Sequence, residues 1–230
     1  MATVTVWSDI HCPWASVVVH RLRKARDEAQ QGLVFDQRPW PLELVNGQGT
    51  PRHIVAPEAA VLSNHEPELF SVYANDSWPS TFLPGFELVA AARQVQGLRA
   101  AEDVDYALRV AFFRHSVDVS IEAGLAQALE LAELPGADDV LAVWRQGAVR
   151  ADVFADYERS KSLPIQGSPQ VFWPDGTSTH NLGWTTTSGF AAFPASSPTT
   201  PRRRCGCCSR RFAVSAPAAS PGCAGRTSSG

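Results

Sequence analysis

The sequence predicts an α/β protein, and three features of its 230 residues carry that prediction. Near the N-terminus, a short alternating stretch is followed by a helical pattern and then by a second alternating stretch, as in a strand–helix–strand unit. The middle of the chain has apolar residues mostly at helical spacing. After it, the pattern returns to strand, turn and strand. We therefore expect a sheet with a large helical segment inserted between its strands.

The N-terminal unit consists of two predicted strands and the helix between them. The first strand is expected at residues 4–7, where apolar residues alternate with polar ones. A helix is expected over residues 16–26, because its apolar residues have helical spacing and its basic end suits a helix C-terminus. Residues 32–42 alternate and then end in prolines, which predicts a second strand that leads into a loop.

The remaining elements follow in order. Helical patterns fill residues 51–161, with apolar stripes typical of packed helices at 86–93 and 104–113. Pro57 is expected in the first turn of one of these helices, where a missing N–H costs nothing. Residues 167–177 predict strand, turn and strand, because Pro-Asp-Gly at 174–176 is a turn sequence.

Cys12 lies where the first predicted strand ends and the first helix begins. Pro13 follows it at the first helical position, which proline favours. A thiol at this point faces free backbone N–H groups and the positive end of the helix dipole, and both favour the reactive thiolate. Cys12 is therefore the candidate catalytic residue, in preference to an inert buried cysteine.

The run Asp9-Ile-His-Cys12-Pro13-Trp14 between a strand and a helix resembles the N-terminus of DsbA-family thioredoxin-fold proteins. The similarity is greatest to cytosolic, actinobacterial-type members. It implies a thioredoxin-like fold with an inserted all-helical subdomain, and thiol–disulfide chemistry with Cys12 as nucleophile. Such proteins usually carry Cys-x-x-Cys, whereas the fourth position here is Ala15, so the resolving cysteine is absent.

The resemblance also implies a cis-proline that packs against the active-site cysteine, at the start of the strand after the insertion. Pro169, preceded by Ser168, is the candidate. In the family, the backbone before the cis-proline hydrogen-bonds an extended peptide or glutathione in the manner of an added strand. Ser168 and Pro169 are thus expected to lie opposite Cys12 and to bind substrate.

Three side chains near Cys12 have a functional and a structural interpretation. Trp14 can wall the substrate groove or pack under the helix, and the sequence does not decide between the two. His11 can stabilise the thiolate, although a solvated histidine is the preferred interpretation. Asp9 can tune Cys12 or cap the helix, and capping is preferred.

The resemblance divides the chain at about residue 183. Residues 1–183 are expected to form the DsbA-like domain, with its thioredoxin part at about 1–50 and 162–183 and its helical insertion at about 51–161. Residues 184–230 are rich in Ser, Pro, Ala, Gly and Arg and contain no acid, so we expect a disordered tail. The family's final helix has no counterpart in this tail, which suggests a reading-frame shift near Leu182.

Three functions remain open at this point. The first is a thiol–disulfide oxidoreductase whose single cysteine forms a mixed disulfide that glutathione or another external thiol resolves. The second is a glutathione-dependent isomerase or transferase acting on a small apolar substrate, similar to 2-hydroxychromene-2-carboxylate isomerases. The third is a non-enzymatic binding protein. An apolar groove with a basic residue favours the second, and a thiol buried away from solvent favours the third.

Charge and composition restrict the partners. All 23 acidic residues but only 14 of the 20 basic ones precede residue 185, so the main body is acidic and is not expected to bind nucleic acid. Neither a membrane span nor a secretory signal is evident, which predicts a cytoplasmic protein. The expected substrate is a disulfide or a glutathione conjugate. No tightly bound cofactor is expected, and glutathione is a possible co-substrate.

No metal site is expected. The tail sequence lacks paired Cys-x-x-Cys spacing and a nearby histidine, although it contains Cys205, Cys207, Cys208 and Cys223. Four of the histidines are dispersed, with no spacing typical of metal ligands: His53, His65, His115 and His180.

Overall fold

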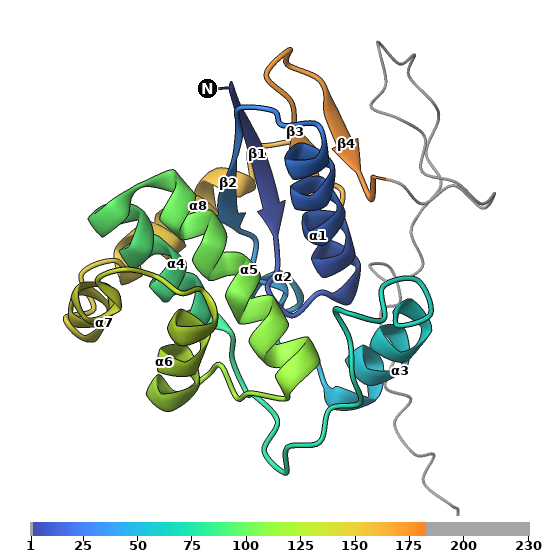
Figure 1. The fold of residues 1–230 in the computed structure, drawn as a ribbon, viewed down its shortest axis with the longest axis vertical. Helices are drawn as coiled ribbons and strands as arrows, with labels where there is room; N and C mark the ends of the chain where they lie inside the picture. Colours follow the sequence, from blue (N-terminus) through green and yellow to red (C-terminus); the bar gives the residue numbers. More distant parts are fainter. Residues whose placement is uncertain (1, 183–230) are drawn as a thin grey trace, which may run out of the picture. The chain divides into compact units, whose positions relative to one another are not determined.

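A computed structural model of the protein describes residues 2–182 and confirms the predicted fold class. A single sheet has the strand order β2–β1–β3–β4 (Figure 1). The strands are β1 (Ala2–Ser8), β2 (Leu33–Pro39), β3 (Gln170–Phe172) and β4 (Ser178–His180). β1 and β2 are parallel, whereas β3 is antiparallel to both β1 and β4. The predicted tail, residues 184–230, lies outside the described residues.

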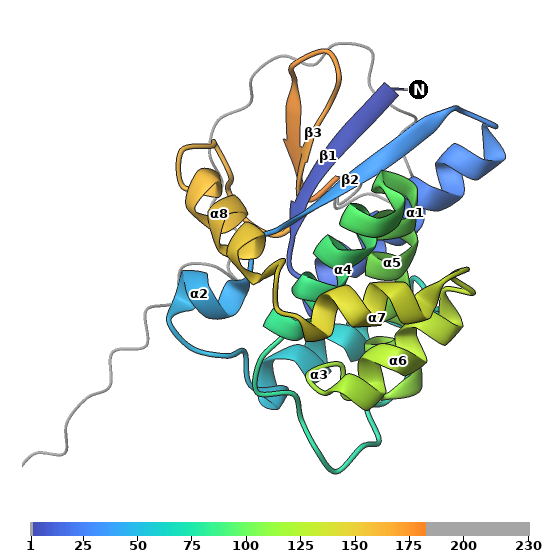
Figure 2. The same ribbon diagram turned by 90° about the vertical axis from the view of Figure 1, so that its left-hand side faces the viewer.

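Eight helices accompany these strands within residues 2–182. α1 (Pro13–Glu28) is the crossover between the parallel strands β1 and β2. The other seven lie between β2 and β3: α2 (Leu42–Asn46), α3 (Arg52–Leu62), α4 (Leu83–Gln96), α5 (Leu98–His115), α6 (Glu122–Leu131), α7 (Ala137–Arg145) and α8 (Arg150–Ser160). In Figure 2, α3, α6 and α7 gather beyond the end of the sheet to which β1 points.

Alternation along β1 assigns the two faces of the sheet. Val4 and Val6 pack with Val18 and Leu22 of α1 in a small core. Trp7 points to the opposite face, where the guanidinium of Arg159 in α8 lies 5.3 Å from its ring centroid. Both faces of β1 are therefore covered near its C-terminal end. The residues of the loop that follows it, 9–12, are buried as well.

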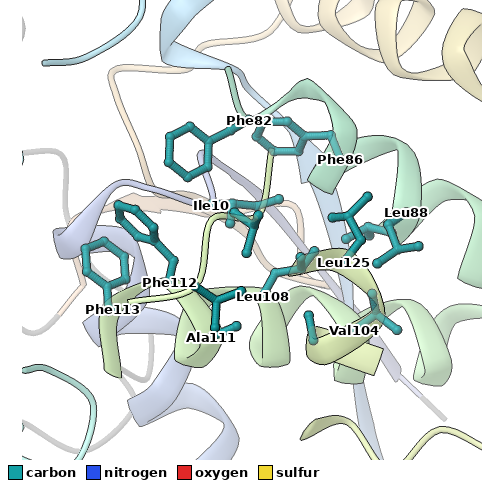
Figure 3. Packing of buried hydrophobic residues seen from close by; sticks show 14 of the residues in the cluster. Ile10, Phe82, Phe86, Leu88, Val104, Leu108, Ala111, Phe112, Phe113 and Leu125 are labelled. Atoms are coloured by element: carbon teal, nitrogen blue, oxygen red, sulfur yellow. The ribbon is translucent and has the colours of Figure 1, made fainter. Parts of the chain in front are cut away.

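The larger core lies among the inserted helices, mainly around α4 and α5. Figure 3 shows Leu108 and Phe112 of α5 beside Phe82 and Phe86, with Ile10 of the loop after β1 pointing into the same cluster. Ile10 is fully buried there. The loop that carries Cys12 is thus anchored by apolar contacts to the helical insertion, in addition to its connection to β1.

A buried carboxylate joins α1, α5 and β2. Glu102 of α5 accepts a hydrogen bond from the backbone N–H of Phe35 at 3.0 Å. Its other oxygen accepts from Arg23 at 2.6 Å and from Arg26 at 2.5 Å, both on α1. Because Glu102 is fully buried, these bonds replace water for its charge and fix the insertion against the crossover helix.

Two local expectations are wrong. Pro57 lies inside α3, which begins five residues earlier at Arg52, so this proline is not in the first turn. The short helix α2 lies in what the sequence suggests is a loop after the second strand. The Pro-Asp-Gly turn is confirmed, because the Trp173 N–H donates to the Thr177 oxygen at 2.8 Å and Gly176 has a φ of 85°.

Candidate active site around Cys12

Cys12 is the N-cap residue of α1, and Pro13 occupies the first helical position as predicted. The Cys12 carbonyl oxygen accepts from the Ser16 N–H at 3.0 Å and from the Ser16 hydroxyl at 3.1 Å. The sequence therefore places the sulfur at the helix N-terminus through ordinary capping geometry.

Ser168 and Pro169 lie opposite Cys12, as the family resemblance implies. The Cys12 thiol donates to the Ser168 carbonyl oxygen at a sulfur–oxygen distance of 3.4 Å. The Ser168–Pro169 peptide bond is cis. The Ser168 hydroxyl also accepts from the Asp9 N–H at 2.8 Å, so two bonds join the loop before β3 to the loop after β1.

The thiol is not poised as a thiolate in this conformation. Cys12 is only 6% exposed, and burial raises the pKa of its thiol to about 12. The Ala15 N–H lowers the pKa, but the negative charges of Asp9 and Glu58 raise it further. The expectation that the helix N-terminus favours the thiolate is therefore corrected, because desolvation of the sulfur outweighs the helix N–H groups.

His11 is buried rather than solvated, contrary to the preferred interpretation of the sequence. Its Nδ1 lies 2.5 Å from Asp9 Oδ1, and its ring stacks on Phe82 with the centroids 4.2 Å apart. Its Nε2 is buried without a hydrogen-bond partner. Only Nδ1 therefore contacts Asp9, and neither ring nitrogen is hydrogen-bonded to the Cys12 sulfur.

Asp9 does not cap α1, because that helix has no side-chain cap. Its Oδ1 accepts from the His11 backbone N–H at 2.8 Å, and its Oδ2 accepts from the Leu42 N–H at 2.5 Å. Leu42 is the first residue of α2, so Asp9 instead accepts from one of the free N–H groups at the start of that helix. Although burial raises the pKa of Asp9, the charge of His11 and these N–H groups outweigh burial and lower it.

Trp14 packs as the structural interpretation expects, and its role as a wall of a substrate groove stays a prediction. Its ring packs against the larger core, while its indole N–H donates to Glu58 Oε2 on α3 at 3.1 Å. Both residues are only partly buried, unlike Cys12, His11 and Ser168. Trp14 and Glu58 therefore form a partly solvent-accessible element next to the buried thiol.

Arg109 hydrogen-bonds the end of β1 and the loop that carries Cys12, and no sequence pattern singled it out. It is fully buried on α5 and pairs with Asp105 through two bonds of 2.9 and 3.1 Å. It also donates to the Asp9 carbonyl oxygen at 2.9 Å and to the Ser8 hydroxyl at 2.8 Å. The only available signal was an Asp–Arg pair at i,i+4 spacing inside an apolar helix, which is common on exposed helices.

A cavity of about 330 Å³ lies away from Cys12, beside the edge strand β2 and helices α4 and α8. Its lining includes Gln37, Arg38, Phe86, Arg93 and Val153. The two arginines pair with Asp36, and both also approach Asp156. Both arginines at this cavity therefore already have protein partners, and Cys12 is not among its lining residues.

One group of metal-ligand side chains occurs among residues 2–182: His20, Glu66 and Glu68, whose ligand atoms lie within 4.8 Å of one another. His20 Nε2 is 3.1 Å from Glu68 Oε1, and Nδ1 is 2.7 Å from the Tyr106 hydroxyl. Glu66 also pairs with Arg21. These atoms already satisfy one another, so the group provides no argument for a resident ion. The tail cysteines lie outside the described residues.

The fold and the cysteine opposite a cis-proline define a thioredoxin-fold protein with a single cysteine at the helix N-terminus. The family model of the DSBA-like thioredoxin domain matches residues 3–193, which is most of the chain. The chain therefore belongs to the DSBA-like thioredoxin domain family, and the predicted family is confirmed. No curated protein matches the chain.

Three solved structures show the same fold. A probable DsbA oxidoreductase from Streptomyces coelicolor is 20% identical (TM-score 0.60), with 78% of this chain and 83% of that chain covered. The cytosolic disulfide reductase DsbM from Pseudomonas aeruginosa is 19% identical (TM-score 0.57; 77% and 87% covered) and is also known with GSH. A 2-hydroxychromene-2-carboxylate isomerase is 14% identical (TM-score 0.54; 75% and 86% covered).

No helix within residues 2–182 is long and apolar enough to cross a membrane.

Proposed function

We propose that this protein is a single-cysteine thiol–disulfide exchange protein, with Cys12 as the nucleophile. The observation that carries the proposal is the hydrogen bond between the Cys12 thiol and the carbonyl oxygen of Ser168, next to cis-Pro169. A backbone carbonyl in this position can accept from an extended peptide that lies beside it as an added strand. The sulfur of a bound disulfide would then lie next to the thiol.

The reaction proceeds in two exchanges. The Cys12 thiolate attacks one sulfur of a disulfide, forms a mixed disulfide and releases the other sulfur as a thiolate, which takes up the proton that Cys12 lost. Since Ala15 replaces the resolving cysteine, an external thiolate must attack the mixed disulfide and release Cys12. The protein returns unchanged, and the external thiol ends in the new disulfide. Glutathione serves as this thiol, in keeping with a reducing cytoplasm and with DsbM being known with GSH.

The protonated, buried thiol sets a condition on this reaction. A thiol with a pKa of about 12 is almost entirely neutral near pH 7, and only the thiolate attacks a disulfide. Substrate binding must therefore expose Cys12 and replace the hydrogen bond to Ser168. In this proposal the substrate backbone takes over the Ser168 carbonyl oxygen, which frees the sulfur at the moment when the disulfide is in place.

The burial of Cys12 also favours a second candidate, a non-enzymatic binding protein that retains the fold without turnover. The glutathione-dependent isomerase has less support. The side-chain charges that act on the thiol, those of Asp9 and Glu58, are negative, whereas a basic residue beside the groove is what the isomerase is expected to have.

The test uses the full-length chain with the four tail cysteines replaced by serine, so that Cys12 is the only cysteine. The protein is incubated with a mixed disulfide of glutathione and 2-mercaptoethanol, and adduct formation and turnover with added glutathione are followed by mass spectrometry. Adduct at Cys12 and turnover, both absent in Cys12→Ser, are the expected results. If Cys12 reacts only in urea and not in the folded protein, the binding protein becomes the better interpretation.

A further inference from the structure

The cavity beside β2, α4 and α8 has the size and the lining of a small-molecule site. Its volume of about 330 Å³ is at the lower end of the range for such sites, about 300–1,000 Å³. Its wall is mainly apolar, and six apolar residues contribute to it: Pro39, Phe86, Val89, Ala90, Val153 and Ala155. A concave, mainly apolar site needs only a few polar groups to orient a ligand.

Gln37 of β2 contributes a carboxamide to the wall of this cavity. The residue is only 3% exposed, and neither the nitrogen nor the oxygen of its side chain has a hydrogen-bond partner among residues 2–182. A carboxamide has two N–H donors and an acceptor oxygen, and burying these atoms without partners costs free energy. A ligand that offers both an acceptor and a donor would recover this cost.

Arg93 of α4 adds a second unpartnered group next to Gln37. Its guanidinium donates to the backbone carbonyl oxygen of Gln37, and its Nη2 pairs with Asp36 at 2.9 Å. Its Nε is buried and has no acceptor within the described part of the chain. The two residues with unpartnered atoms therefore contact each other at the edge of β2, and both line the cavity.

The charges around the cavity oppose an anionic ligand, in spite of the two arginines. Arg38 pairs with Asp36 and Asp156, and Arg93 pairs with Asp36. Asp152 also lines the cavity, and this exposed carboxylate forms no ion pair with any residue in the range 2–182. A carboxylate or phosphate would have to compete with the aspartates for the arginines, whereas an uncharged group can bond the unpartnered atoms without breaking an ion pair.

We propose that this cavity binds an uncharged carboxamide carried on a small aromatic body. The carbonyl oxygen of the ligand accepts from the Arg93 Nε–H, its amide N–H donates to Gln37 Oε1, and its ring packs against Phe86 and Val89. The Gln37 side chain turns towards the ligand to make this bond, because its amide lies within the wall of the cavity. This site is separate from Cys12, and the proposal does not depend on the proposed thiol–disulfide exchange.

The test titrates the ¹⁵N-labelled, full-length protein under reducing conditions with benzamide and with benzoate, which have the same shape but differ in charge. NMR spectra record the side-chain NH₂ signal of Gln37 and the Nε–H signal of Arg93, which Gln37→Met and Arg93→Lys assign by their loss. Benzamide should shift both signals saturably, with a dissociation constant on the order of 1 mM for so small a molecule. Benzoate should bind at least roughly threefold more weakly.

Three variants probe the two parts of the argument. Gln37→Met keeps the length of the side chain but removes the amide, and should weaken benzamide binding by roughly three- to ten-fold, as expected for about one hydrogen bond. Gln127→Met is the matched control, because Gln127 is an exposed glutamine of α6 outside the cavity lining, and it should leave binding unchanged. Asp152→Asn removes the unpaired charge and should strengthen benzoate relative to benzamide by roughly two- to five-fold.

Each result decides for or against the proposal. The absence of a saturable shift up to about 20 mM benzamide overturns the site. Benzoate binding as tight as that of benzamide overturns the carboxamide as its ligand, and so does an unchanged benzamide affinity in Gln37→Met. If Gln37→Met does not fold by circular dichroism, the order of the two ligands and the response to Asp152→Asn decide. None of these measurements involves the reactivity of Cys12, so their failure leaves the exchange function standing.

Discussion

The thiol of Cys12 and the carbonyl oxygen of Ser168 lie 3.4 Å apart, although 156 positions separate them in the sequence. This contact joins the N-terminus of α1 to the cis-proline loop before β3 and buries the sulfur. Burial raises the pKa of the thiol in this conformation, and in the proposed exchange the substrate displaces the bond to Ser168.

The buried thiol predicts a loss of stability at alkaline pH. The folded pKa of Cys12, about 12, exceeds the value of about 8.5 for a free cysteine, so its contribution is complete below pH 8.5 and is lost as the pH rises towards 12. Above about pH 9, each pH unit should cost at most about 1.4 kcal/mol. Urea unfolding at pH 7 and pH 10, in the background without tail cysteines, measures this loss.

Cys12→Ser is the control for that measurement, because serine does not titrate in this range. Burial also raises the pKa of Tyr73 to about 12, so tyrosine titration contributes to both proteins and cancels in the comparison. Parallel losses of stability in the two proteins would show that the thiol is accessible to solvent in solution, contrary to the structure.

Removal of Arg109 should destabilise the whole site. Arg109→Met leaves the buried Asp105 carboxylate and the Asp9 carbonyl oxygen without their donor, and the expected loss is about 3–5 kcal/mol in the free energy of unfolding. The double variant Arg109→Met/Asp105→Leu should recover part of this loss, since no unpaired charge remains. Arg99→Met is the exposed control, with an expected loss below about 1 kcal/mol. Equal losses for Arg99 and Arg109 would contradict the buried pair.

Asp9→Asn should cost about 2–4 kcal/mol at pH 7, because the amide replaces one of the two acceptor oxygens with a donor and leaves the N–H of either His11 or Leu42 without its bond. The pKa of Asp9 is lowered in the folded protein, so its contribution is present above its unfolded value near 4 and disappears as the pH falls through the folded pKa. The difference between the two proteins should therefore shrink in acid. Asp76→Asn, in an exposed loop, should change stability little, and a pH-independent difference for Asp9→Asn would argue against the ionised carboxylate.

Ala15→Cys should restore an internal resolving step. Position 15 is in the first turn of α1, so a cysteine there completes the Cys-x-x-Cys spacing with Cys12. In the background without tail cysteines, oxidation should close a disulfide between Cys12 and the introduced cysteine, and the variant should reduce insulin disulfides faster than the parent with dithiothreitol as reductant. Ala15→Ser is the control for the added side chain at this fully buried position. Two free thiols after oxidation would show that the site cannot adopt the exchange geometry.

Local sequence determined much of this architecture. The alternation at residues 4–7, the helical spacing after Pro13 and the Pro-Asp-Gly turn each depend on backbone preferences or on one-sided burial within a few residues. These local preferences predicted β1, α1 and the β3–β4 turn. They did not predict that α3 begins at Arg52 and continues through Pro57, because packing of the helix outweighs the hydrogen bond that proline removes.

In the candidate site, too, some features follow from the local sequence and others only from the tertiary structure. The sequence by itself determined that Cys12 is at a helix N-terminus, that Ala15 leaves it without a resolving partner, and that Pro169 is the candidate for the proline opposite it. Only the tertiary structure decided that the thiol is buried with a raised pKa, that Asp9 hydrogen-bonds the first N–H of α2, and that Arg109 and Glu58 flank the site. Desolvation and charge act through space between segments distant in sequence, so no local pattern around Cys12 could reveal them.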